Sequence, residues 1–175
     1  MKIIVLGCGV IGVTTAWFLS RDGHDVTVIE REAAAAAGTS FANAGLLSPG
    51  HAFTWARPGV PMTLLRSFWR DDTGLRLRLR LDPRMWSWGL KFLAQCTHDR
   101  ARVNSLGKLR ISLFSQEVLH DLLAGTDIAF DHQRGGILYL NRDPAALDRS
   151  IAEMTLLVDN GVTMEVLDAA GCARI

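Results

Sequence analysis

Two hydrophobic patterns follow one another in the first 30 residues. Ile3–Leu6 is an unbroken apolar run, which is typical of a parallel strand covered on both faces. From Val10 to Phe18 the apolar residues recur at spacings of three and four, which predicts a helix, and Gly23 follows where a left-handed cap belongs. Asp25–Glu30 has a largely apolar interior and is predicted to be a second strand. The chain therefore begins with a predicted β-α-β unit.

Helical patterns recur later in the chain. Asp82-Pro83 has the residue types of an N-cap and a first helical position, so a helix is predicted to begin there. Leucines at helical spacing predict a longer helix from Arg100 to Leu123. Asp143-Pro144 predicts a helix that runs to Gly161, and another helix is expected to begin near Asp168.

Three later segments are predicted to be strands. Leu75–Leu81 alternates leucine and arginine strictly, and Ile137–Asn141 and Val162–Leu167 flank one of the predicted helices. The last two segments would make a second β-α-β pattern. Leu46–Pro61 is instead expected to be a long loop rich in glycine and proline, and long loops inside compact domains are often functional. The alanine tract Ala33–Ala37 is read as a short helix start or a loop.

The turn after the first strand has the spacing of a phosphate-binding loop. Gly7 permits a tight turn, Gly9 lets the backbone approach a pyrophosphate, and Gly12 allows the helix to pack closely on the strand. The helix N-terminus offers unpaired N–H groups to the phosphates. Glu30, at the end of the second strand, would accept hydrogen bonds from ribose hydroxyls. Together these features predict a bound adenine dinucleotide.

Composition narrows the class of protein. The 175 residues are 49% hydrophobic, as expected of a chain that can bury a core, and 19 basic side chains nearly balance 18 acidic ones. This balance gives no electrostatic case for nucleic-acid binding. Cys8, Cys96 and Cys172 lack the spacing of a metal or disulfide framework. With no signal peptide and no apolar run of the ~18 residues that a transmembrane helix needs, a cytoplasmic protein is predicted.

Several motifs resemble those of one superfamily. The matching segments are Gly7–Gly12, Gly23–Arg31, Thr39–Gly45, Leu47–His51 and Trp55–Pro61. The first three resemble the flavin-dependent amine oxidoreductases of the D-amino acid oxidase superfamily. The last two narrow the resemblance to the bacterial D-amino acid dehydrogenases (small subunit). The likeness covers the whole chain, but members of the family are more than twice as long, so the chain is expected to correspond to an N-terminal fragment of them.

The resemblance implies FAD as the cofactor and two groups of residues that would bind it. The group toward the pyrophosphate and adenosine is Gly7, Gly9, Val10, Ile11, Gly12, Glu30 and Arg31. The group toward the flavin is Thr39, Ser40, Asn43, Ala44, Gly45 and Leu46. Cys8 departs from the smaller residue that is usual at its position, and the alanine tract replaces a more mixed segment.

The resemblance also implies a fold and an activity. An α/β, Rossmann-like FAD-binding βαβ unit (residues 1–75) would be followed by the beginning of an α+β substrate domain (residues 76–175). The activity would be oxidation of a D-amino acid such as D-alanine to an imino acid, which water hydrolyses to a 2-oxo acid and ammonia. The family's substrate-binding groups come largely from its C-terminal half, so no catalytic residue is named, and the 175-residue chain alone is expected to lack turnover. His51 and Trp55 are read as packing residues, with a substrate role as the alternative.

The electron acceptor is expected to be a quinone or an electron-transfer chain, and other activities stay open. One alternative is a glycine- or sarcosine-type oxidase that uses oxygen, and another is a non-catalytic remnant; the Thr39–Gly45 loop disfavours a nicotinamide enzyme. A basic-aromatic segment could meet an anionic membrane, placing the protein on the inner face of the cytoplasmic membrane. We favour the alternative that the charged side chains form a solvated face and that the aromatic rings pack beneath it as a core. Its residues are Arg66, Phe68, Trp69, Arg70, Arg76, Arg78, Arg80, Arg84, Trp86 and Trp88.

Overall fold

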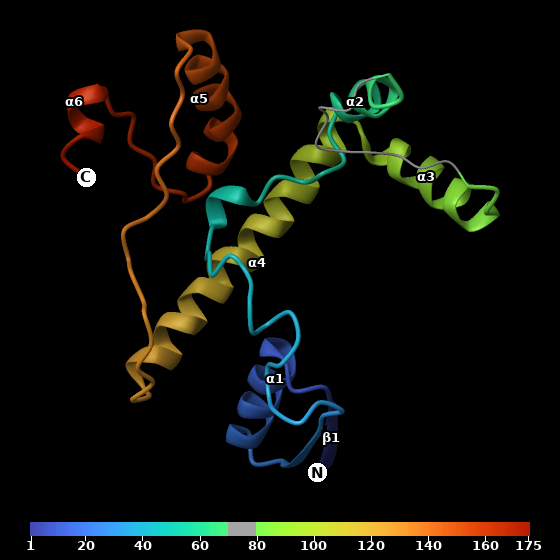
Figure 1. The fold of residues 1–175 in the computed structure, drawn as a ribbon, viewed down its shortest axis with the longest axis vertical. Coiled ribbons are helices and arrows are strands. Elements are labelled where there is room, and N and C mark those ends of the chain that lie inside the picture. The colour runs from blue at the N-terminus through green and yellow to red at the C-terminus, as the bar shows by residue number, and fades with distance from the viewer. Residues whose placement is uncertain (70–79) are drawn as a thin grey trace. The chain divides into compact units, whose positions relative to one another are not determined.

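The computed structural model describes residues 1–69 and 80–175, and these form two compact units, Met1–Leu47 and Ser48–Ile175 (Figure 1). The predicted domain boundary at residues 75 and 76 lies outside the described residues and stays a prediction. Most of the alternating segment Leu75–Leu81 lies outside them too.

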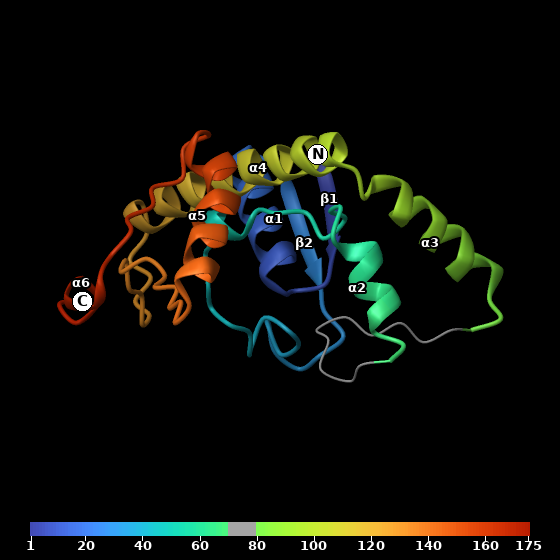
Figure 2. The same ribbon diagram turned by 90° about the horizontal axis from the view of Figure 1, so that it is seen from above.

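The first unit is the predicted β-α-β unit. Strand β1 (Lys2–Leu6) is followed by helix α1 (Val10–Arg21) and strand β2 (Asp25–Ile29). The two strands are parallel and in register from Lys2 opposite Asp25 to Leu6 opposite Ile29, and Figure 2 shows them side by side. This part of the predicted fold class is confirmed.

Gly23 ends helix α1 as the sequence predicts. Its φ is 82°, a left-handed value that favours glycine. Its N–H donates to the carbonyl of Ser20 (3.0 Å), and the N–H of His24 donates to that of Leu19 (3.1 Å). These are the two hydrogen bonds of a Schellman motif, which satisfies carbonyls left open at a helix end.

The regular elements that the structure describes in the second unit are all helical, and irregular segments join them. A 3-10 turn, η1 (Pro49–His51), precedes helices α2 (Val60–Arg66), α3 (Pro83–Gln95), α4 (His98–Ala124), α5 (Pro144–Val158) and α6 (Ala169–Cys172). Its core consists of Ala52, Leu109 and Leu157, against which Phe53, Leu113, Met154 and Val162 pack. None of the described helices is both long enough and apolar enough to cross a membrane.

Aspartate caps open three of these helices, at three places where the sequence predicts helices to begin. The carboxylate of Asp82 accepts the N–H of Arg84 (2.9 Å) at the start of α3. At the start of α5, the side chain of Asp143 accepts a hydrogen bond from the N–H of Ala145 (3.1 Å). At the start of α6, the side chain of Asp168 accepts one from the N–H of Gly171 (2.6 Å). Each side chain satisfies one of the donors that a helix N-terminus leaves unpaired, which accounts for where these helices begin. The helix predicted from Arg100 to Leu123 is confirmed within α4.

Three predictions about local structure are wrong. Ile137–Asn141 and Val162–Leu167 are not strands, because no described segment supplies the backbone partners that a strand requires. The second β-α-β pattern is therefore represented by α5 alone. The Leu46–Pro61 segment is not loop throughout, since it contains η1 and the first residues of α2. The alanine tract Ala33–Ala37, for which a short helix start or a loop was predicted, is a loop of bends and turns.

The basic-aromatic segment is only partly described, because Arg70, Arg76 and Arg78 lie outside the described residues. Trp69 and Trp88 are 77% and 62% exposed, and each contacts an aromatic neighbour, Phe68 and Phe92 respectively, so these two residues are not buried in an aromatic core. Contact with a membrane stays a prediction.

Leu109 provides a test of the second unit's core. Replacing it with alanine should lower the free energy of unfolding by about 2–5 kcal/mol, because the side chain is only 1% exposed and its loss leaves a cavity. Ile111→Ala, on the same helix but 69% exposed, is the matched control and should cost far less. Chemical denaturation followed by circular dichroism measures both. Equal losses in the two variants would contradict the assigned core.

Candidate nucleotide-binding site

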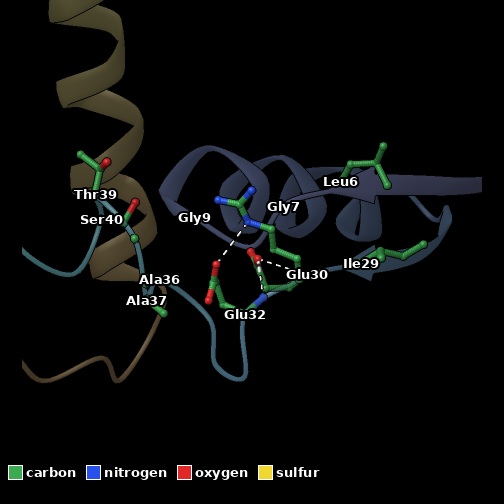
Figure 3. A pocket seen from close by; sticks show the side chains of 12 residues that line it. Leu6, Gly7, Gly9, Ile29, Glu30, Glu32, Ala36, Ala37, Thr39 and Ser40 are labelled. Atoms are coloured by element: carbon green, nitrogen blue, oxygen red, sulfur yellow. Dashed lines mark hydrogen bonds and ion pairs between the residues drawn. The ribbon is translucent and has the colours of Figure 1, made fainter.

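A hollow of about 610 Å³ lies in the first unit, where the glycine loop meets the segment that follows β2. Six of the residues predicted to bind the cofactor line it: Gly7, Gly9, Glu30, Arg31, Thr39 and Ser40. The other lining residues are Leu6, Ile29, Glu32, Ala36, Ala37 and Gly38. Figure 3 shows Glu30 and Glu32 beside the glycine loop, and Thr39 and Ser40 on the segment beyond Ala36 and Ala37.

The glycine loop is held by close backbone contacts. Gly7 has a φ of 96°, and its N–H donates to the carbonyl of Ile29 (2.8 Å), which extends the pairing of the strands by one bond. A Cβ built on Gly12 would lie 1.9 Å from the carbonyl oxygen of Gly7. No side chain fits in that space, so glycine is required if α1 is to begin this close to the turn.

The first turn of α1 supplies backbone donors beside the hollow. Gly9 is the N-cap residue and offers no side-chain cap, and the first turn carries no acidic residue. The N–H groups of Val10, Ile11 and Gly12 precede the first donor paired within the helix, since the N–H of Val13 is the one that bonds to the carbonyl of Gly9 (2.9 Å). Such donors at the positive end of a helix dipole suit the oxygens of a phosphate.

Glu30 joins the end of β2 to the glycine loop. Its carboxylate accepts hydrogen bonds from the backbone N–H groups of Cys8 (2.6 Å), Arg31 (2.7 Å) and Glu32 (3.0 Å). These bonds favour the charged form, with the one from Cys8 contributing most, and they hold the pKa of Glu30 below its ordinary value of 4.5. A ribose contact was predicted from the sequence, but this backbone role was missed. The strand register could have indicated it, because Leu6 pairs with Ile29 and so brings Glu30 level with the glycine loop.

The alanine tract contributes to the site in a way that its composition did not reveal. The N–H of Ala36 donates to the carbonyl of Cys8 (2.9 Å), so the tract is fastened to the glycine loop. Ala36 has a φ of 59°, a left-handed value that is costly for a residue with a Cβ. Ala36 and Ala37 both line the hollow.

Two other predicted residues, Arg31 and Asn43, use their side chains in local contacts. Arg31 pairs with Glu32 (Nε to Oε1, 3.2 Å), and because the two side chains are 90% and 52% exposed this ion pair adds little stability. Asn43 forms a local turn, in which its side-chain oxygen accepts the N–H of Gly45 (2.7 Å). Seven predicted residues are not among those that line the hollow: Val10, Ile11, Gly12, Asn43, Ala44, Gly45 and Leu46.

His51 and Trp55, weighed above as substrate contacts, belong to the second unit. The ring of His51 is hydrogen-bonded through Nε2 to the hydroxyl of Tyr139, and Trp55 is largely exposed. Neither lines the hollow. Their role therefore stays a prediction.

Gly12→Ala tests the close contact under α1. We expect a loss of about 1–3 kcal/mol in the free energy of unfolding of the first unit, because the added methyl group would overlap the carbonyl of Gly7. Gly38→Ala is the matched control, since a Cβ there meets nothing within 4 Å. Thermal unfolding compares the two variants, and an unaffected Gly12→Ala variant would show that α1 does not begin this close to the turn.

The lowered pKa of Glu30 predicts how stability depends on pH. A carboxylate whose pKa is lower in the folded chain stabilises it above the ordinary pKa of 4.5, and this contribution is lost as the pH falls through the lower folded value. Unfolding temperature measured across this acidic range should therefore fall more steeply for the unsubstituted chain than for Glu30→Gln. Parallel pH profiles for the two proteins would contradict the assigned hydrogen bonds.

Comparison with known proteins agrees with the motifs and the site. The model of the FAD dependent oxidoreductase family (DAO) matches residues 2–175. The chain is 46% identical over 167 residues to D-amino acid dehydrogenase 2 of Mesorhizobium japonicum, an alignment that covers 95% of the chain and 40% of the relative. It is 44% identical over 175 residues to the D-amino acid dehydrogenases of Azorhizobium caulinodans and Rhizobium rhizogenes, with 100% of the chain and 42% of each relative covered.

The chain thus spans about two fifths of the length of these curated relatives. No solved structure matches it significantly. The family match over nearly the whole chain, together with a glycine loop, a helix N-terminus and an acid at the end of the second strand, confirms the resemblance stated above. The chain belongs to the FAD-dependent oxidoreductase family.

Proposed function

We propose that the hollow of the first unit binds the adenosine and pyrophosphate part of FAD. Three observations support the fit: Gly9 has no Cβ, the first turn of α1 offers backbone donors, and that turn carries no acidic side chain. Gly7, Gly9, Val10, Ile11 and Gly12 would hold the pyrophosphate through the backbone. Glu30 and Arg31 would lie toward the adenosine.

Glu30 can serve both the loop and the cofactor. Its Oε2 accepts one hydrogen bond, from Cys8, and a carboxylate oxygen has room for a second donor such as a ribose hydroxyl. Glu30 is charged at neutral pH, as an ordinary glutamate is, and a charged carboxylate forms a stronger hydrogen bond with a hydroxyl group than a neutral acceptor does. The flavin end would be bound by residues 39–46, of which Thr39 and Ser40 line the hollow.

We propose further that the whole protein is a D-amino acid dehydrogenase. The observation that carries this proposal is the identity of 44–46% to three relatives that bear that name, over almost all of the chain. Bound FAD would supply the two-electron oxidation of the amine, which leads to a 2-oxo acid and ammonia. D-amino acids such as D-alanine are the proposed substrates, and a quinone or electron-transfer chain is the proposed acceptor.

The described residues of this chain are assigned cofactor binding and no catalytic step. The relatives are more than twice as long as the chain. We place the groups that bind the substrate carboxylate, and an α+β substrate domain, in the part of the protein that corresponds to their remaining length. The helical second unit would be the beginning of that domain.

A chimera tests the proposed function. The matching segment of the Mesorhizobium japonicum relative is replaced by this chain, and the purified protein is assayed for bound FAD, dye reduction, 2-oxo acid and peroxide. We expect a yellow protein that reduces dye with D-alanine and forms little peroxide. The chimera that carries Gly9→Val should not bind FAD, because the valine side chain would occupy the space that the pyrophosphate needs beside the glycine loop.

Each outcome of this assay decides something. A chimera that retains FAD but oxidises no D-amino acid would contradict the proposed reaction. Peroxide formed in step with 2-oxo acid would favour the oxidase alternative. Bound FAD in the Gly9→Val chimera would contradict the proposed cofactor site.

A further inference from the structure

Ser40 caps helix α1 from a distance of 30 residues along the chain. Its hydroxyl oxygen accepts the N–H of Val10 at 2.9 Å. Helix caps usually come from the N-cap residue itself, but that residue is Gly9, which has no side chain to offer. The hydroxyl of Ser40 therefore performs the task that a local serine or aspartate performs in other helices.

The same hydroxyl fills the space that Gly9 leaves open. A Cβ built on Gly9 would lie 3.2 Å from the oxygen of Ser40, so this oxygen stands directly over the glycine. The proposed pyrophosphate needs both that space and the donors at the start of α1. A single N–H makes one well-aligned hydrogen bond, so Ser40 and a phosphate oxygen cannot both take the N–H of Val10 at full strength.

Where the structure describes the chain, the segment that carries Ser40 is not hydrogen-bonded to the strands. Among the described residues, its other hydrogen bonds are local: Phe41 N–H to the carbonyl of Gly38 (3.0 Å), and Gly45 N–H to the side chain of Asn43 (2.7 Å). No described hydrogen bond ties residues 38–47 to β1 or β2. Release of Ser40 would thus cost the cap and little else.

We propose that Ser40 is a reversible cap, which holds the N–H of Val10 in the cofactor-free protein and gives it up to the pyrophosphate of FAD. This inference rests on the proposed function, and it replaces the flavin contact proposed for Ser40 with a positioning role that opposes binding of the pyrophosphate. Any stabilisation that the cap lends to the cofactor-free state is subtracted from the affinity for FAD, because binding must first undo it. Ser40 thereby protects the helix N-terminus while the site is empty.

The test is Ser40→Ala, with Ser40→Thr as the variant that restores a hydroxyl and Ser115→Ala as a control on an exposed serine of the second unit. Affinities for FAD and for ADP, which carries the diphosphate without the flavin, are measured by calorimetry. We expect Ser40→Ala to bind both about fivefold more tightly, which corresponds to the roughly 1 kcal/mol of a side-chain cap. The same variant should unfold at a lower temperature without ligand. Ser40→Thr and Ser115→Ala should match the unsubstituted chain in affinity.

The opposite signs of the two effects separate this role from a merely structural one. A residue needed only for folding would lower both stability and affinity, and a residue that donates to the phosphate would lower affinity alone. Unchanged or weaker binding of FAD and ADP by Ser40→Ala therefore overturns the inference, as does an unchanged unfolding temperature of the free protein. Failure of the unsubstituted chain to bind either ligand contradicts the proposed function itself, whereas binding with the wrong order of affinities contradicts the reversible cap alone.

Discussion

The first unit depends on the close approach of helix α1 to the turn that leads into it. The backbone at Gly12 passes so near the carbonyl of Gly7 that an added Cβ would overlap it. This contact sets the helix N-terminus beside Gly9, which lines the hollow. The position of the backbone donors at the start of α1 follows from it. A larger residue at position 12 would force the start of the helix away from the carbonyl of Gly7.

Glu30 supplies the second constraint on this loop. A loop of small residues has no side chains with which to fix its own shape, and here a carboxylate at the end of β2 fixes it from outside through the N–H of Cys8. The parallel register of the strands makes this geometry possible, because it brings the ends of β1 and β2 to the same edge. The same carboxylate is the proposed ribose acceptor, so the order of the loop and the recognition of adenosine would depend on one charged group.

Local chemistry predicted much of the fold, and long-range contacts account for what it missed. The aspartate caps of α3 and α5 and the start of α6 were predicted correctly, because a cap and its helix are adjacent in the sequence. Ile137–Asn141 has the residue types of a strand, yet strands need partners, and no described segment pairs with it. Within the site, the spacing of the glycines could be recognised from the sequence. The contacts that reach it from Ser40 and Ala36 were not, because they join residues about 30 positions apart and depend on the path of an irregular segment. The motifs identified the family and its cofactor, whereas the individual binding residues stay predictions.

The central claim is that the backbone at the start of α1 receives a dinucleotide's pyrophosphate. Backbone amide resonances of the 175-residue chain, followed while ADP is added, test it most directly. The account predicts saturable shifts at Gly9, Val10, Ile11 and Gly12, and smaller shifts at Ala124 and other residues of the second unit's helices. Saturable shifts confined to the second unit, or none at the glycine loop at millimolar ADP, would contradict it.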